Sequence, residues 1–195
     1  MAVGRPLQFD PDQALNAALA VFWQHGYEST SLQDLLNAMQ LSKSSFYQAF
    51  GNKQALFERC IQQYRNDTLR ELRAAMENCD DPLALIEGLY RGTLIQREAN
   101  EYHWGCLVMN TASEFSQRNR SIAEEVTRSV QALTDVFEAL ILQGQASGAI
   151  HQRQSAKKLS QYLMSNLSGL HTLLKTGISH EEAEAIIETI VLSLK

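Results

Sequence analysis

A short polar segment, Ser42-Lys43-Ser44-Ser45, carries the residues best suited to bind an anion. Serine is a common N-cap residue, and the first turn of a helix has free backbone N–H groups at the positive end of the helix dipole. Three hydroxyl groups and one lysine ammonium group would join those N–H groups at the same place. Phosphate is an anion that such helix starts commonly bind, so the segment predicts contacts with a phosphate backbone.

A second segment, residues 100–110, gathers aromatic side chains around a thiol. We expect a loop that leads into a helix at about Gly105, with Cys106 in its first turn. The helix dipole favours a thiolate there, which would make Cys106 a sensor of electrophiles or oxidants. The alternative is a small residue in the core or in a cavity wall, because free cysteine is among the most buried residue types. The candidate residues for ligand or thiol sensing are Tyr102, His103, Trp104, Cys106 and Asn110.

These residue types also allow two other interpretations. Cys106 and His103 could serve as the nucleophile and base of an enzyme, but no third residue that would orient the base has a recognisable spacing. The aromatic side chains are equally suited to an apolar ligand pocket between helices. The segment therefore favours a ligand or thiol site, with a catalytic site as the alternative.

Two short helices must position the polar segment. Thr30 and Ser31 are N-cap types, and they precede an apolar series at i, i+3, i+4 and i+7 that predicts one buried helix face: Leu32, Leu35, Leu36 and Met39. The pattern restarts at Ser42, and residues 42–50 form a second helix with Phe46 and Phe50 on one side. Two such helices joined by a tight turn predict a helix-turn-helix, whose second helix enters the DNA major groove. The alternative is a pair of packing helices in a protein-interaction adaptor.

The flanking residues extend this unit. Asp10-Pro11 is an N-cap followed by proline, and Gly26 ends the helix that begins there. We expect Trp23 and Tyr27 to pack between this helix and the next two. Residues 1–9 form an extended arm whose Arg5 could reach a minor groove or a phosphate, unless the arm is disordered. Lys53, in the first turn of a third helix, would favour an anion such as a DNA phosphate, the alternative being a solvated lysine.

Composition sets the fold class and the compartment. Of 195 residues, 45% are hydrophobic and 20% are charged, which is typical of a globular protein. The chain has only three prolines and ten glycines, and long segments repeat their apolar residues with the helical period. We therefore expect an all-α protein. No apolar run reaches the roughly 18 residues of a membrane span. Three cysteines without metal-type spacing indicate a reducing cytoplasm, no metal site and no cofactor. The net charge of −5 argues against indiscriminate binding of nucleic acid.

The rest of the chain, residues 54–195, predicts further helices. One begins after the N-cap Asn52 and runs to about residue 78, another begins near 82, and another covers about 121–144. Two strongly apolar helices follow at 154–176 and 179–195. They are either core helices or a surface for a second subunit.

The N-terminal motif resembles the TetR-type (TetR/AcrR) repressor family over residues 10–57. The residues that carry the resemblance are Gly26, Tyr27, Thr30, Ser31, Ala38, Ser42, Lys43, Tyr47, Phe50 and Lys53. Gln40 departs from the pattern, because the family usually has glycine there; a left-handed Gln40 would cost on the order of 1 kcal/mol. Gly105, Cys106, Leu107, Asn110 and Glu114 are similar to one branch of the family.

The resemblance implies an all-α protein of about nine helices. It implies a helix-turn-helix DNA-binding domain at 1–53 and a helical ligand-binding and dimerisation domain at 54–195. The implied activity is that of a homodimeric repressor, not an enzyme, released from a pseudopalindromic double-stranded DNA operator by a small-molecule effector of unknown identity. The expected DNA contacts are Arg5, Thr30, Ser31, Ser42, Lys43, Ser44, Ser45, Tyr47, Gln48 and Lys53. The expected dimer interface is Leu163, Leu167, Leu170, Ile187, Ile190 and Val191.

Overall fold

Helices are the only regular secondary structure in the described part of the chain. The computed structural model describes residues 9–77, 79–99, 104–115 and 119–195. In chain order its helices are α1 (Pro11–His25), α2 (Leu32–Met39), α3 (Lys43–Phe50), α4 (Lys53–Glu77), α5 (Pro82–Ala99), α6 (Leu107–Phe115), α7 (Arg120–Ser147), α8 (Ala156–Lys175) and α9 (His180–Leu192). The all-α prediction is confirmed. None of the helices in the described ranges is long and apolar enough to cross a membrane.

Local capping explains where most of these helices begin. The Asp10 carboxylate accepts hydrogen bonds from the first backbone N–H groups of α1, and proline occupies the first helical position. Ser31 and Ser179 form capping boxes at α2 and α9, in which serine and an acidic residue three positions on satisfy each other's backbone N–H groups. Asn52 caps α4 through a 2.8 Å bond to the Ala55 N–H, as its residue type predicts.

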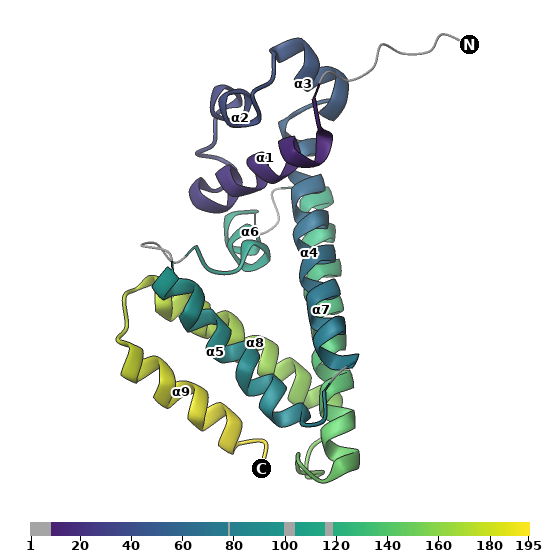
Figure 1. Cartoon of the computed structure of the whole chain (residues 1–195), viewed down its shortest axis with the longest axis vertical. Coiled ribbons are helices and arrows are strands. Elements are labelled where there is room, and N and C mark those ends of the chain that lie inside the picture. The colour runs from purple at the N-terminus through teal and green to yellow at the C-terminus, as the bar shows by residue number, and fades with distance from the viewer. Residues whose placement is uncertain (1–8, 78, 100–103, 116–118) are drawn as a thin grey trace, which may run out of the picture.

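Two long helices connect the parts of the molecule. α4 has 25 residues and α7 has 28, and they run side by side (Figure 1). α4 spans about 37 Å at 1.5 Å per residue. Its first two turns belong to the head, which we define as α1–α3 with residues 53–61 of α4. The remainder of the described chain is the body, and α6 lies where head and body meet.

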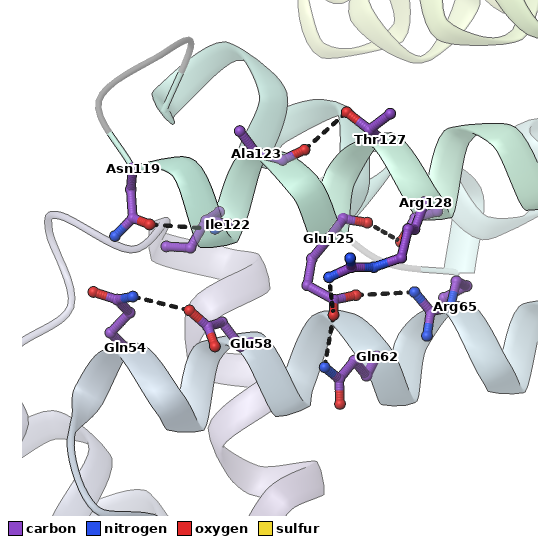
Figure 2. Close-up of polar contacts among 11 residues, drawn as sticks. Gln54, Glu58, Gln62, Arg65, Asn119, Ile122, Ala123, Glu125, Thr127 and Arg128 are labelled. Carbon is purple, nitrogen blue, oxygen red and sulfur yellow. Dashed lines mark hydrogen bonds and ion pairs between the residues drawn. The ribbon is translucent and has the colours of Figure 1, made fainter.

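A buried carboxylate on α7 forms hydrogen bonds and an ion pair with α4. Figure 2 shows that Glu125 of α7 accepts hydrogen bonds from Gln62 at 2.8 Å, Arg65 at 2.9 Å and Arg128 at 2.7 Å. The Glu125 side chain is only 7% exposed. Burial alone would raise the pKa of this carboxyl group, but hydrogen bonds from Arg128 and Gln62 and the two guanidinium charges outweigh it and hold the pKa below its usual value.

The hydrophobic core has two clusters. The head cluster contains Phe46 and Phe50 of α3 and Leu56 and Phe57 of α4, but also Phe115 of α6. The body cluster lies between α5, α7, α8 and α9. The start of α4 therefore belongs with the head, and Phe115 joins this cluster from the body.

The predicted dimer interface requires a correction. Leu163, Leu170, Ile187, Ile190 and Val191 are each at most 5% exposed within a single chain, and Leu167 is half-buried. These side chains form the inner stripes of α8 and α9 and pack in the body cluster. An interface on these helices must therefore use their outer stripes, where Tyr162, Leu173 and Leu192 are 39%, 40% and 65% exposed.

Candidate nucleic-acid interface and effector cavity

The second helix of the helix-turn-helix presents a polar face to solvent. Ser42 is the N-cap of α3, and its hydroxyl group accepts a 3.1 Å hydrogen bond from the Ser45 N–H. Phe46 and Phe50 anchor the helix in the head cluster, as their spacing predicts. The exposed side chains on the other side are Ser42, Lys43, Ser44, Tyr47 and Gln48. This geometry leaves the first turn and one whole face of α3 available to a ligand.

The turn between α2 and α3 contains the expected strained residue. Gln40 has φ 54° and ψ 40°, the left-handed conformation that the family's glycine would adopt without strain. Among the described residues other than glycine, no other has a positive φ. The backbone N–H group of the next residue, Leu41, donates a 3.0 Å hydrogen bond to the carbonyl oxygen of Leu36. The left-handed turn therefore keeps the tight connection that places α3 against α2.

The two predicted caps of α2 have different roles. Ser31 is exposed and completes the capping box with Asp34; its hydrogen bonds lower the pKa of the Asp34 carboxyl group. Thr30 is 1% exposed, and its hydroxyl group donates to the Gly26 carbonyl oxygen at 2.6 Å. The predicted phosphate contact by Thr30 is corrected accordingly: its hydroxyl group is buried and already satisfied, so it fixes the α1–α2 turn.

Two further predicted DNA contacts differ in their surroundings. Lys53 lies at the start of α4 with its Nζ atom 4.2 Å from the centre of the Tyr27 ring, so its charge already has an aromatic partner. Arg5 lies outside the described residues, as do Tyr102 and His103. The described polar face is thus formed by α3, the capping residue Ser31 and Lys53.

The head and the body are connected through α6 at both of its ends. The indole N–H of Trp23 donates to the Gly105 carbonyl oxygen at 2.9 Å, just before α6 begins. Near the other end of α6, the Glu114 carboxylate accepts from the backbone N–H groups of Tyr27 at 2.9 Å and Glu28 at 2.6 Å. Both contacts hold the end of α1 and the turn that follows it. The two ends of α6 are therefore both hydrogen-bonded to the head.

This arrangement corrects the expected packing of Trp23. Its ring contacts Tyr64 and Trp104 edge to face, with centroids 5.1 and 5.8 Å away, so it packs on the body and not between the first helices. Tyr27 does pack in the head, against Phe22 and Phe57, but it also contacts Phe115 of α6. The sequence contained no local signal for these contacts.

A cavity of about 570 Å³ lies beneath this junction, between α1, α4, α5, α6, α7 and α8. Trp23 and Cys106 line its end near the head, and leucine, phenylalanine and methionine side chains line the deeper part. Its volume falls within the roughly 300–1,000 Å³ range of pockets for small organic ligands. The cavity is therefore a candidate effector site.

Cys106 lies in the wall of this cavity. It is 7% exposed and directly precedes α6, and its carbonyl oxygen accepts the Asn110 N–H at 2.9 Å. The Tyr64 hydroxyl group donates to Cys106 Sγ at 3.8 Å, and burial raises the pKa of that tyrosine well above its ordinary value. Cys106 thus occupies the place that the second interpretation predicts, a buried residue in a cavity wall, and its role as a thiol sensor stays a prediction.

Lys175 lies beside Cys106 at the start of α6, and the sequence did not predict it there. Its side chain crosses Gly105 so closely that a Cβ atom there would lie 2.6 Å from Lys175 Cε, and its ammonium group donates to the Asn110 Oδ1 atom. Burial lowers the pKa of this ammonium group, and nearby Cys106 opposes that shift. Asn110 in turn donates to the Trp104 carbonyl oxygen at 2.7 Å. The structure thus brings Trp104, Cys106 and Asn110 together and adds Lys175 from the end of α8.

Comparison with known proteins agrees with this arrangement. The family model "Bacterial regulatory proteins, tetR family" matches residues 14–60, and "Tetracyclin repressor-like, C-terminal domain" matches residues 82–190. The HTH-type transcriptional repressor ComR of Escherichia coli K12 is 27% identical over 188 residues, which are 95% of this chain and 89% of ComR. The repressor DhaR of Mycobacterium sp. GP1 is 24% identical over 174 residues, 89% of this chain and 86% of DhaR.

A solved structure covers both parts of the chain. A cysteine mutant of the TetR family transcriptional regulator CifR, complexed with 26bp double-strand operator DNA, superposes with a TM-score of 0.86 at 26% identity. The superposition covers 98% of this chain and 100% of that one. The similarity therefore extends from α1 to α9.

Proposed function

This chain belongs to the TetR family of DNA-binding transcriptional regulators, and we propose that it is a homodimeric repressor that a small molecule or a thiol modification releases from its operator. The observation that carries the proposal is the exposed polar face of α3, which Phe46 and Phe50 anchor in the head cluster. The similar CifR mutant was solved with operator DNA.

The proposed DNA contacts follow from exposure. Lys43, Ser44, Tyr47 and Gln48 face the major groove, while the first N–H groups of α3 and the Ser42 and Ser45 hydroxyl groups meet phosphates. Ser31 and Lys53 lie beside them, and Lys53 would exchange its aromatic partner for a phosphate. Arg5 of the N-terminal arm is the proposed minor-groove contact.

The proposed dimer uses the outer stripes of α8 and α9. Tyr162, Gly169 and Leu173 are exposed at i, i+7 and i+11 of α8, and Leu192 is exposed on α9. A Cβ atom at Gly169 would meet no other atom within 4 Å, so a second helix can approach the backbone closely there. Such a surface is self-complementary in a twofold dimer, which would place two recognition helices roughly 34 Å apart in successive major grooves.

The proposed response begins at the cavity and passes through α6. A ligand in the cavity, or a modified Cys106, acts on the residues where α6 begins, and both ends of α6 are bonded to the head. The ligand releases DNA only if it binds more tightly to the arrangement that does not fit the operator. Alkylation of Cys106 that leaves operator affinity unchanged would remove the thiol part of this proposal, not the ligand part.

A gel shift on the DNA that flanks the protein's own gene tests the function. We expect a retarded complex with the unaltered protein and about hundredfold weaker binding by Tyr47→Ala, because the dimer would lose two base contacts of about 1.4 kcal/mol each. Arg153→Ala, an exposed change in the loop before α8, is the control and should bind normally. Absence of any retarded complex at low salt across that region would refute the repressor proposal.

A further inference from the structure

The effector cavity opens to solvent between α4 and α5. Among its lining residues, only Glu71 and Ala75 of α4 and Gly88 of α5 are exposed; the others are half-buried or buried. Asp67 and Gly92 lie one helical turn further along the same two helices. We call these five residues the cavity mouth. One side of the mouth carries two carboxylates and the other carries two glycines.

The two glycines keep the mouth wide. Gly88 and Gly92 are at i and i+4 in the interior of α5, so they share one face of the helix. A Cβ atom at either position would meet no other atom within 4 Å. Glycine inside a helix is destabilising relative to alanine, and neither position has a close neighbour that requires glycine. What the two glycines provide is a bare strip of backbone facing the cavity.

The charge at the mouth has one sign. The cavity lining contains two carboxylates, Asp67 and Glu71, and no lysine or arginine; its one histidine, His171, lies on α8 and not at the mouth. Asp67 is paired with the Arg70 guanidinium group at 2.7 Å, whereas no hydrogen bond or ion pair joins Glu71 to any described residue. An anion that enters here would pass a carboxylate without a counter-ion, while a cation would supply one.

Apolar side chains form most of the lining below the mouth, together with the polar side chains of Tyr64, Thr68, Thr93, Ser168 and His171. Leu72, Leu89, Leu133, Phe137, Met164 and Leu167 enclose the cavity below the mouth. An occupant would therefore bury an apolar body among these side chains, and a cationic group on it would find its counter-ion at Glu71.

We propose that the cavity selects amphipathic molecules with a flat apolar body and a cationic or neutral polar group, and that it excludes carboxylates. Glu71 selects the charge, and Gly88 and Gly92 leave room for the flat body. This inference rests on the proposed function, because it concerns the same cavity.

Three probes of nearly equal shape test the charge selection by isothermal titration calorimetry on the full-length protein. They are 1-naphthylmethylammonium, 1-naphthylmethanol and 1-naphthoate. We expect the ammonium compound to bind at least tenfold more tightly than the carboxylate, with the alcohol in between. Glu71→Gln, an exposed substitution, should lower the affinity of the ammonium compound to that of the alcohol and leave the alcohol unchanged.

Two substitutions test the glycines with the same probes. Gly92→Leu should weaken all three at least tenfold because its side chain fills the mouth, and Gly92→Ala is the matched control with a smaller loss. Gly88→Leu, at an exposed position, gives a second variant if Gly92→Leu does not fold. Equal affinity for the carboxylate and the ammonium compound, no binding of any probe, or unchanged binding by both leucine variants would overturn the inference. Normal gel shifts by the same proteins would show that the proposed function stands even then.

Discussion

Removal of the Glu125 carboxylate should loosen the contact between α4 and α7. In Glu125→Ala, three donors lose their acceptor: the Gln62 amide and the Arg65 and Arg128 guanidinium groups. The Arg128 side chain is 56% exposed and can turn to water, but Arg65 is 18% exposed and is held against α7. The cost therefore comes mainly from one cation left without its counter-ion.

The expected loss is about 3 kcal/mol of unfolding free energy. Removing one partner of a buried ion pair typically costs about 3–5 kcal/mol, and we take the lower end because Arg128 is recovered by solvent. For a protein of this size about 1 kcal/mol corresponds to roughly 2–4 °C, so Tm should fall by about 6–12 °C. Urea unfolding followed by circular dichroism measures the free energy directly.

A neighbouring residue provides the control. Glu124 pairs with Arg120 on the exposed side of the same helix, where the Arg120 side chain is 93% exposed. Glu124→Ala should cost about 0.5 kcal/mol or less. Equal effects of the two substitutions would refute the argument that the Glu125 network fastens the two helices.

The pH dependence gives a second check with a definite sign. The folded-state pKa of Glu125 lies below its ordinary value, so its stabilising contribution is complete above the unfolded-state value of about 4.3 and is lost as the pH falls through the folded-state pKa. The stability difference between the unaltered protein and Glu125→Ala should therefore be constant near neutral pH and shrink in acid. A difference that grows in acid would contradict the assignment.

Three further predictions concern the turn, the head–body contact and the dimer. Gln40→Gly should raise the unfolding free energy by about 0.5–1 kcal/mol in urea, because it removes the strain of a left-handed glutamine; no gain would show that the turn is unstrained. Glu114→Gln should lower the unfolding free energy by about 1 kcal/mol, because only one acceptor oxygen then remains for the two backbone N–H groups of Tyr27 and Glu28. Ser113→Ala, at the exposed neighbouring position, is the control. Leu173→Glu should sediment as a monomer while the unaltered protein sediments as a dimer; unchanged sedimentation would refute the proposed interface.

Local features of the chain were predictable because their causes lie within a few residues. Ser31 and Ser42 cap helices through N–H groups three positions away, and Phe46 with Phe50 share a face one turn apart. The left-handed turn at Gln40 followed from the glycine that the family has there. The recognition helix could therefore be located before the structure was known.

Contacts over long sequence separations could not be predicted in this way. Trp23 and Gly105 are 82 residues apart, and Lys175 and Asn110 are 65 apart, so no periodicity relates them. Burial was misjudged for a related reason. The apolar stripe of α8 looks the same whether it packs on its own chain or on a second subunit, and only the structure showed that Leu163 and Leu170 pack inside one chain.

DNase I footprinting on the DNA that flanks the protein's own gene tests the central claim most directly. If α3 of each subunit lies in a major groove, the footprint should show two protected half-sites whose centres are about one helical turn, or 10 base pairs, apart or a multiple of it. Tyr47→Ala should weaken protection of both half-sites together. A single protected half-site, or protection unaffected by substitutions on the exposed face of α3, would contradict the claim that this helix reads the operator in a dimer.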